Sequence, residues 1–297
     1  ASVLFLITRN LADGLRLYYR DYPAEAPGRT PVLCLPGLTR NSRDFESIAL
    51  RIRRSRRVLC ADLRGRGRSQ HDPVWQHYHP GTYLADLGLL LQDAGVTRCV
   101  LLGTSLGGIL SMLLAAMNPP LVAGVILNDV GPEVAPEGLA RIAAYVGRHA
   151  PPASWDEAVA TVRATYEIGM PGLTHAEWVT HTKRSYSDAG GVPRVDMDPM
   201  IGEAVRSAPS AAAPDLWALF AALLPVPTLA LRGATSDILA VATFDRMLRE
   251  KPDLVRVEAH VARRLLDEGA GARRALVVQA EGADLRLVVE ARGLHRL

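Results

Sequence analysis

The pentapeptide at residues 103–107 reads Gly-Thr-Ser-Leu-Gly and carries a serine that could act as a nucleophile. It lies between an apolar run typical of a strand and a segment with helical spacing. A sharp strand-to-helix turn exposes the serine hydroxyl, and it needs small residues on both sides because helix and strand converge there. The helix N-terminus also favours developing negative charge. The pattern predicts Ser105 as the nucleophile of an acyl-transfer reaction.

A serine hydroxyl needs a base to remove its proton and an acid to orient that base. When the nucleophile lies on such a turn, the acid and then the histidine follow it along the chain. Asp237 follows an apolar run at 228–231 that predicts a strand, which places it at the same sheet edge as Ser105. Asp129, just after a predicted strand at 122–127, is the rival acid. The sequence favours Asp237, for which capping the next helix is the alternative role.

The same chain order restricts the choice of base. Six of the eight histidines precede Asp237: His71, His77, His79, His149, His175 and His181. Of the other two, His260 directly follows a predicted strand at 254–258, whereas His295 lies near the end of the sequence. We therefore predict His260 as the base.

An acyl-transfer site also needs N–H donors for the oxyanion of the tetrahedral intermediate. The backbone N–H of Leu106, immediately after the nucleophile, is one candidate. The loop after the predicted strand at 32–35 supplies the other, the N–H of Leu38, because Gly37 permits the sharp backbone path that turns this amide inward.

A metal site is not indicated. His77 and His79 flank Tyr78 in a loop before a predicted helix at 82–94, and we find no carboxylate or thiol to complete a ligand set. We expect this histidine pair to be solvated.

The elements that must position these residues follow an α/β pattern. Short apolar or β-branched runs alternate with helical spacing from residue 15 to 130 and again after residue 214, which indicates a mostly parallel sheet. Strands are predicted at 15–20, 32–35, 57–61, 99–102, 122–127, 228–231 and 254–258, and helices at 41–53, 82–94, 106–117, 214–224 and 239–251.

Residues 132–213 depart from this pattern. Helices are predicted at 137–149, 154–168 and 174–185, separated by Pro and Gly pairs, with no convincing strand. We therefore divide the chain into a first core part at 1–131, a helical insertion at 132–213, and a second core part at 214–297 with an atypical C-terminal tail.

Composition excludes several classes of protein. The 297 residues carry a net charge of +3, with 48% hydrophobic and 22% charged residues, which excludes disordered, collagen-like and coiled-coil chains. The longest early apolar run, 3–7, is too short to span a membrane and follows no basic signal segment. Three cysteines inside apolar runs predict buried, reduced thiols in a cytoplasmic protein.

The partners follow from the same features. The arginine-rich stretch at 51–57 is expected to be a solvated helix end, because the overall charge is small and few aromatic residues lie nearby. We therefore expect a small-molecule substrate, with no nucleic acid and no membrane, and a homo-oligomer is not excluded.

These pieces together resemble the α/β-hydrolase family over about residues 12–258. The matching stretches are 35–38 in the oxyanion loop, 62–69 after the next strand, the turn at Ser105, and 231–233 before Asp237. The stretch at 62–69 looks like that of small-molecule esterases, enol-lactonases and carbon–carbon bond hydrolases. The resemblance implies a sheet of about eight strands, a helical cap at 132–213 and no cofactor. Serine at position 105 disfavours the members that use an aspartate nucleophile.

Two features depart from the family pattern. The oxyanion loop usually begins with His-Gly, and here Pro36 takes the first position. The family histidine follows a small glycine-containing loop, which His260 lacks. The tail at 260–297 has no aromatic residue, and strands are predicted at 275–279 and 285–290. The unusual sequence of this tail is explained equally by a translated alternative reading frame of the gene and by a natural extension of the protein.

The sequence therefore predicts a serine hydrolase that cleaves a small, apolar carboxylic ester or lactone through an acyl-enzyme on Ser105. The cap, with Tyr145, Trp155 and Trp178, is expected to supply an apolar pocket. Hydrolysis of a carbon–carbon bond in a ring-cleavage dienoate, or a catalytically impaired ligand-binding fold, are the alternatives.

Overall fold

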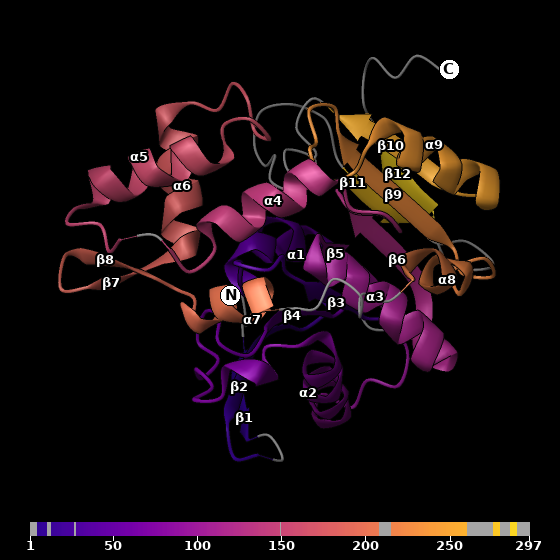
Figure 1. The fold of residues 1–297 in the computed structure, drawn as a ribbon. Coiled ribbons are helices and arrows are strands. Elements are labelled where there is room, and N and C mark those ends of the chain that lie inside the picture. The colour runs from indigo at the N-terminus through magenta and orange to yellow at the C-terminus, as the bar shows by residue number, and fades with distance from the viewer. Residues whose placement is uncertain are drawn as a thin grey trace.

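The computed structural model shows one central sheet with helices on both faces and a second group of elements at one edge of it (Figure 1). It describes residues 5–10, 13–26, 28–148, 150–207, 215–259, 276–279 and 286–289. His260 and His295 lie outside the described residues.

Eight strands within these ranges form the central sheet, in the order β1-β2-β4-β3-β5-β6-β9-β10. β1 pairs antiparallel with β2, and β2 with β4, whereas every other neighbouring pair is parallel. The predicted fold class, a mostly parallel eight-stranded sheet, is confirmed. The strands are β1 (Phe5–Asn10), β2 (Arg16–Tyr22), β3 (Val32–Leu35), β4 (Val58–Asp62), β5 (Cys99–Thr104), β6 (Val122–Asn128), β9 (Thr228–Gly233) and β10 (Val255–Ala259).

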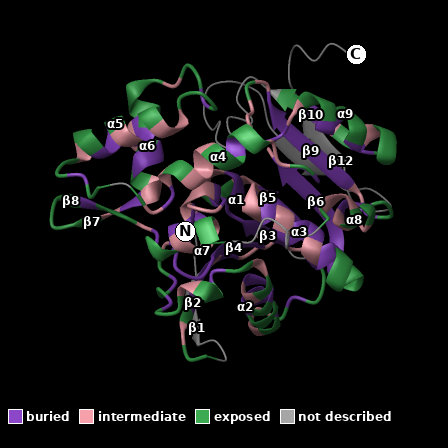
Figure 2. Ribbon diagram, in the orientation of Figure 1, coloured by how far each residue is buried: buried purple, intermediate pink, exposed green. Residues whose placement is uncertain are grey.

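Helices cover both faces of the sheet, and the strands between them are buried (Figure 2). One face packs against α1, and the opposite face packs against α2, α3, α8 and α9. β3 is buried along its whole length because alternate side chains enter the two cores. The helices are α1 (Glu46–Ile52), α2 (Pro80–Asp93), α3 (Leu106–Met117), α8 (Leu216–Ala221) and α9 (Val241–Glu250), with 3-10 helices at Ser42–Phe45, Trp75–His77 and Pro119–Leu121.

The predicted elements of the core are present. β3 and α3 have the predicted bounds, and the other predicted strands and helices of the core are displaced by a few residues at their ends. β1 was not predicted; it includes part of the early apolar run and pairs with β2 at the sheet edge. The two strands predicted in the tail correspond to β11 (Leu276–Gln279) and β12 (Arg286–Val289), which pair antiparallel.

The segment between β6 and α8 contains a group of elements beside the sheet, and we call its residues 132–207 the cap. Its helices are α4 (Pro136–Tyr145), α5 (Trp155–Tyr166), α6 (His175–Ser185) and α7 (Met200–Ser207). In Figure 1, α4 lies between the sheet and the α5–α6 pair. α5 and α6 enclose a small apolar cluster of their own, so this part of the cap has its own core.

The prediction that the insertion contains no strand is wrong. A hairpin of β7 (Tyr186–Ala189) and β8 (Val192–Val195) follows α6. Gly190 and Gly191 connect the two strands, with φ values of 68° and 89°. Positive φ at both central residues favours a two-residue hairpin turn, which a glycine pair supplies. Both strands are four residues long and mostly exposed, so they lack the extended apolar alternation by which a strand is recognised.

The prediction of a solvated arginine stretch at 51–57 is also wrong in part. α1 ends at Ile52, and the arginines after it fold back onto the core. Arg53 and Arg56 are buried and donate to the carbonyl oxygens of Pro23 and Thr30, whereas Arg57 pairs with Asp21. These side chains therefore hold loops together and present no continuous basic surface.

The three cysteines are buried and form no disulfide, as the apolar runs around them predict. Among the described residues, no helix is both long enough and apolar enough to cross a membrane.

The turn between β5 and α3 is closely packed. A Cβ placed on Gly107 would lie 2.1 Å from the carbonyl oxygen of Leu35, and one on Gly103 would lie 2.3 Å from the carbonyl oxygen of Gly107. Neither position can accept a side chain without moving backbone. This contact fixes the start of α3 against β3.

We expect Gly107→Ala to lower the free energy of unfolding by about 2–4 kcal/mol. Gly88→Ala is the matched control, because Gly88 lies in α2 and its Cβ would meet nothing within 4 Å. There, alanine should stabilise the helix by about 0.5–1 kcal/mol. Urea unfolding of both variants tests the difference, and equal stabilities would contradict the close packing at the turn.

Candidate active site

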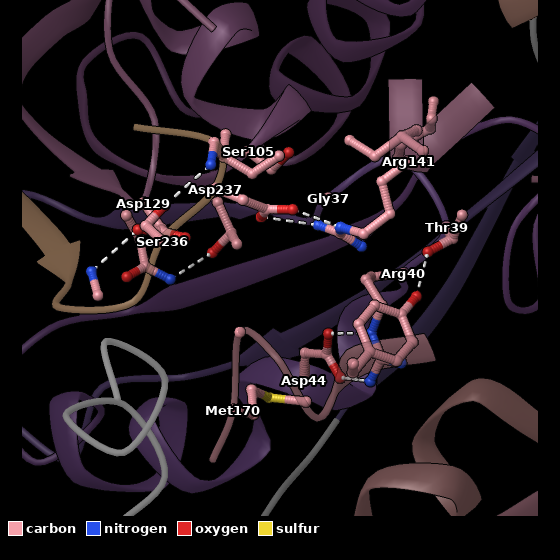
Figure 3. A pocket seen from close by; sticks show the side chains of 18 of the residues that line it. Gly37, Thr39, Arg40, Asp44, Ser105, Asp129, Arg141, Met170, Ser236 and Asp237 are labelled. Atoms are coloured by element: carbon pink, nitrogen blue, oxygen red, sulfur yellow. Dashed lines mark hydrogen bonds and ion pairs between the residues drawn. The ribbon is translucent and has the colours of Figure 1, made fainter. Parts of the chain in front are cut away.

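A cavity lies at the carboxyl edge of the sheet, where the loops after β3, β5, β6 and β9 meet the cap (Figure 3). The carboxyl ends of neighbouring parallel strands are where ligands bind in α/β sheets of this kind. Residues of the core that line it include Gly37, Leu38, Ser105, Asn128, Asp129, Gly233, Ser236 and Asp237, and those of the cap include Arg141, Ile142, Tyr145, Tyr166 and Met170.

Ser105 lies at the turn from β5 into α3, as predicted. Its backbone has φ 50° and ψ −116°, a conformation that is costly for a residue with a side chain. The backbone N–H of Ser105 donates to the carbonyl oxygen of Asn128 at 3.1 Å, which holds the turn against the end of β6. The strained conformation persists because both sides of the turn are fixed, and it leaves the serine at the cavity wall.

The two predicted oxyanion donors lie beside the serine. A Cβ placed on Gly37 would lie 3.6 Å from the Cβ of Ser105, so the loop after β3 passes next to this serine. Within the described chain, the backbone N–H groups of Leu38 and Leu106 donate to no protein acceptor. Both amides are therefore available to a ligand oxygen.

Arg66 supports this loop from below the cavity. The side chain is fully buried, and its Nε donates to the carbonyl oxygen of Leu38 at 2.8 Å. Its Nη1 donates to the carbonyl oxygen of Arg64 and to the hydroxyl of Tyr83, over whose ring the guanidinium lies. These contacts fix the peptide that follows Leu38, and they thereby restrict the orientation of the adjoining peptide, which carries the Leu38 N–H.

Replacing Arg66 should therefore impair turnover more than substrate binding. We expect Arg66→Met to lower kcat by about tenfold or more, because a displaced oxyanion donor stabilises the transition state less, while KM changes little. Arg68→Met is the control, since the Arg68 guanidinium lies over the Tyr18 ring and does not bond to Leu38. Steady-state kinetics on folded protein tests this, and a change in KM alone would contradict the role of Arg66.

Asp129 follows β6 directly and is held in place by its neighbours. Its φ is 54°, a second positive value at the cavity wall. Its Oδ1 accepts the backbone N–H of Gly233 at 2.9 Å, and the Ser236 hydroxyl also bonds to the carboxylate. Desolvation raises the pKa of Asp129 despite these hydrogen bonds. The carboxylate is thus fixed in a low-dielectric position close to the serine turn.

Asp237 also reaches the cavity, but its carboxylate is occupied. Nε and Nη2 of Arg141, in α4, donate to its two oxygens at 2.5 and 2.9 Å. Figure 3 shows this ion pair at the cavity wall. The sequence analysis did not identify Arg141, because its partner is 96 residues away along the chain.

No histidine lines the cavity within the part of the chain that the structure describes. The predicted base, His260, and its rival, His295, lie outside that part. β10 ends at Ala259, which is paired with Gly233 of β9, so the chain reaches the carboxyl edge of the sheet at this point.

The aromatic residues predicted to form the pocket separate into two sets. Tyr145 lines the cavity, as expected. Trp178 is buried between α5 and α6, and Trp155 packs against the same cluster, so neither lines the cavity. The two tryptophans therefore stabilise the cap, whereas the apolar part of the cavity wall comes from other cap residues, among them Ile142 and Met170.

The loop after β3 is attached to the cap at four positions between residues 39 and 43. The cap contributes one side chain and one backbone carbonyl oxygen of α6, one side chain at the end of α5, and one side chain just after the hairpin. The pairs are Thr39 with Tyr166, Arg40 with Ser185, Asn41 with the carbonyl oxygen of Arg184, and Arg43 with Asp196.

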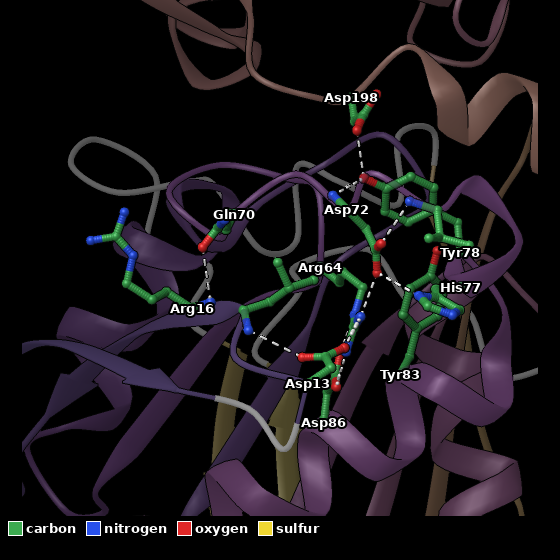
Figure 4. A network of polar contacts seen from close by, with 12 residues as sticks. Asp13, Arg16, Arg64, Gln70, Asp72, His77, Tyr78, Tyr83, Asp86 and Asp198 are labelled. Atoms are coloured by element: carbon green, nitrogen blue, oxygen red, sulfur yellow. Dashed lines mark hydrogen bonds and ion pairs between the residues drawn. The ribbon is translucent and has the colours of Figure 1, made fainter.

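The expectation that no carboxylate accompanies His77 is wrong. Nδ1 of His77 lies 3.0 Å from Asp72, which the loop between β4 and α2 brings back toward it (Figure 4). Asp13 lies within the same group, and these three side chains could hold a metal ion. Nη1 of Arg64 donates to both carboxylates, however, so a guanidinium already supplies the positive charge between them.

The sheet order, the strained serine at a strand-to-helix turn and the inserted cap define an α/β hydrolase. The sequence matches the family profile described as "alpha/beta hydrolase fold" over residues 30–189, and the chain belongs to this family. The resemblance found from the sequence is thereby confirmed.

Three known proteins align over most of the chain. A 3-hydroxybutyrate-oligomer hydrolase from Cupriavidus necator is 31% identical, over 82% of this chain and 85% of its own. The crystal structure of an alpha/beta hydrolase from Novosphingobium aromaticivorans is 42% identical, with a TM-score of 0.83, and the match covers 90% of this chain and 95% of that one. The structure of E-2-(acetamidomethylene)succinate hydrolase, 23% identical with a TM-score of 0.69 over 86% and 91%, shares the fold.

Proposed function

We propose that this protein is a serine hydrolase that cleaves a small carboxylic ester through an acyl-enzyme on Ser105. The observation that carries the proposal is the serine in a strained turn at the cavity wall, with two unoccupied backbone N–H groups beside it. Strain of this kind is retained where the surrounding structure serves a function.

In this mechanism the Ser105 hydroxyl attacks the ester carbonyl carbon as His260 removes its proton. The N–H groups of Leu38 and Leu106 stabilise the resulting oxyanion. The intermediate collapses, and the alcohol leaves with the proton from the imidazolium. A water molecule then attacks the acyl-enzyme by the same route, which releases the acid and restores Ser105.

For the acid that orients the base, the geometry favours Asp129 over Asp237. Both oxygens of Asp237 pair with Arg141, whereas Asp129 is fixed by neutral donors and adjoins the serine turn. A carboxylate already neutralised by a guanidinium would stabilise an imidazolium only weakly. We therefore propose Asp129 as the orienting acid. The sequence alone predicts Asp237 for this role, and that remains the alternative.

The substrate class follows from the cavity and from one relative. The wall combines apolar groups such as Ile142 and Met170 with the polar groups around Arg141, so it suits a short ester that carries polar substituents. The relative from Cupriavidus necator is named for hydrolysis of 3-hydroxybutyrate oligomers, which are esters of this kind. We propose a short hydroxy-acid ester as the substrate.

A burst experiment tests the acyl-enzyme. Mixed rapidly with 4-nitrophenyl butyrate, the enzyme should release nitrophenol in a burst equal to the enzyme concentration, followed by slower turnover. A fluorophosphonate probe should label Ser105, as mapped by peptide mass spectrometry. The absence of both the burst and the labelling would contradict the proposal. It would support a ligand-binding protein with this fold.

A further inference from the structure

We propose that Arg141, held by Asp237, binds a free carboxylate of the substrate, so that the enzyme selects esters that carry an acid group. This inference rests on the proposed function, because it concerns the substrate of the same cavity. It gives the Arg141–Asp237 pair a role in specificity rather than in the chemical step.

Asp237 occupies only some of the N–H donors of the Arg141 guanidinium. Nε and Nη2 of Arg141 donate to Asp237, and Nη1 has no acceptor within the described chain. A guanidinium has five N–H donors in a rigid plane, so it can bind one carboxylate along one edge and a second one at its remaining nitrogen. Arg141 is partly exposed at the cavity wall, where a ligand can reach it.

The ion pair is held rigidly, which a binding group needs. A Cβ placed on Gly138 would lie 2.3 Å from the carbonyl oxygen of Asp237, so α4 packs directly against this loop. The backbone N–H of Ala135 also donates to the carbonyl oxygen of Ile238 at 2.9 Å. Because its geometry is fixed before the ligand arrives, Arg141 loses little conformational freedom on binding.

The other cation at the cavity is less suited to this role. Arg40 makes a two-point ion pair with Asp44, and its Nη1 is directed at Ser185 and His181. Those contacts attach it to the cap. Arg141, in contrast, is flanked by Ile142 and Tyr145 of the same helix, and apolar neighbours strengthen a charged hydrogen bond.

Substrate pairs that differ only in the acid group test the proposal. We would compare the 3-hydroxybutyrate dimer with its methyl ester, and mono(4-nitrophenyl) glutarate with 4-nitrophenyl butyrate. The wild type should prefer an acid over its neutral partner by about 10- to 100-fold in kcat/KM, the range expected for one charged hydrogen bond.

Arg141→Met and Arg141→Gln should reduce this preference to about threefold or less. Arg43→Met is the matched control, because Arg43 also joins core and cap through an ion pair but does not line the cavity. It should retain the wild-type preference. Equal kcat/KM values within both wild-type pairs, or an undiminished preference in the folded Arg141 variants, would overturn the inference.

A binding measurement separates this inference from the proposed catalysis. Calorimetry on Ser105→Ala should detect 3-hydroxybutyrate, and should detect its amide at least about tenfold more weakly. Adding Arg141→Met should remove that difference. If no ester is hydrolysed yet the acid binds through Arg141, the proposed function fails and the subsite stands. If esters are hydrolysed but acid and amide bind alike, the subsite fails.

Discussion

Ser105→Ala is expected to abolish ester hydrolysis, lowering kcat by at least about 10³-fold. No other group at the wall of the described cavity combines a nucleophilic oxygen with two unoccupied amides beside it. The folded state should be little affected, because the hydroxyl of Ser105 accepts or donates no side-chain hydrogen bond among the described residues. Turnover of 4-nitrophenyl butyrate and thermal unfolding by circular dichroism measure the two effects.

Ser111→Ala provides the matched control in the same helix. The Ser111 hydroxyl is buried and donates to the carbonyl oxygen of Gly107 at 2.8 Å, so its removal affects packing below the turn and leaves the nucleophile in place. We expect less than about a tenfold loss of kcat there. A Ser105→Ala variant that kept more than about a tenth of wild-type turnover would rule out the acyl-enzyme on Ser105.

Asp129→Asn is expected to lower kcat by about 10³- to 10⁴-fold, because an amide favours the wrong tautomer of the base. Asp237→Asn should cost less than about tenfold on a neutral ester, since its carboxylate serves Arg141. Kinetics of the two variants with 4-nitrophenyl butyrate decides between the acids. The reverse ranking would restore Asp237 as the orienting acid.

Stability provides an independent measurement of the Asp129 variant. Burial raises the pKa of Asp129, so the folded protein disfavours the ionised form relative to the unfolded chain. Stability linked to such a group is fully present below the unfolded pKa and is lost as the pH rises through the folded pKa. Near neutral pH, Asp129→Asn should therefore keep or raise the thermal midpoint while it removes activity.

The features predicted best from the sequence are those that depend on residues close together along the chain. β3 and α3 have the predicted bounds because apolar runs between clear turn signals leave few alternatives. The serine turn was found for a related reason, since small residues must flank the hydroxyl at fixed spacing. Neither prediction required knowledge of which distant residues meet.

Predictions failed where contacts between distant segments decide the outcome. The sequence favoured Asp237 over Asp129 as the acid but could not show the contact of Arg141 with Asp237, and that assignment stays a prediction. Trp155 and Trp178 were expected in the pocket, yet the packing of α5 on α6 buries them elsewhere. The β7–β8 hairpin was missed because its strands are too short and too exposed to show a buried face.

The four contacts between the loop after β3 and the cap have a consequence for how the proposed catalysis is controlled. The same loop carries the Leu38 amide, so lifting the cap on this side would break the contacts that hold Thr39, Arg40 and Asn41. Cap docking and the readiness of the oxyanion site are therefore thermodynamically linked: whatever stabilises one stabilises the other. In the proposed mechanism, this link would restrict hydrolysis to the closed form, in which the substrate is already enclosed.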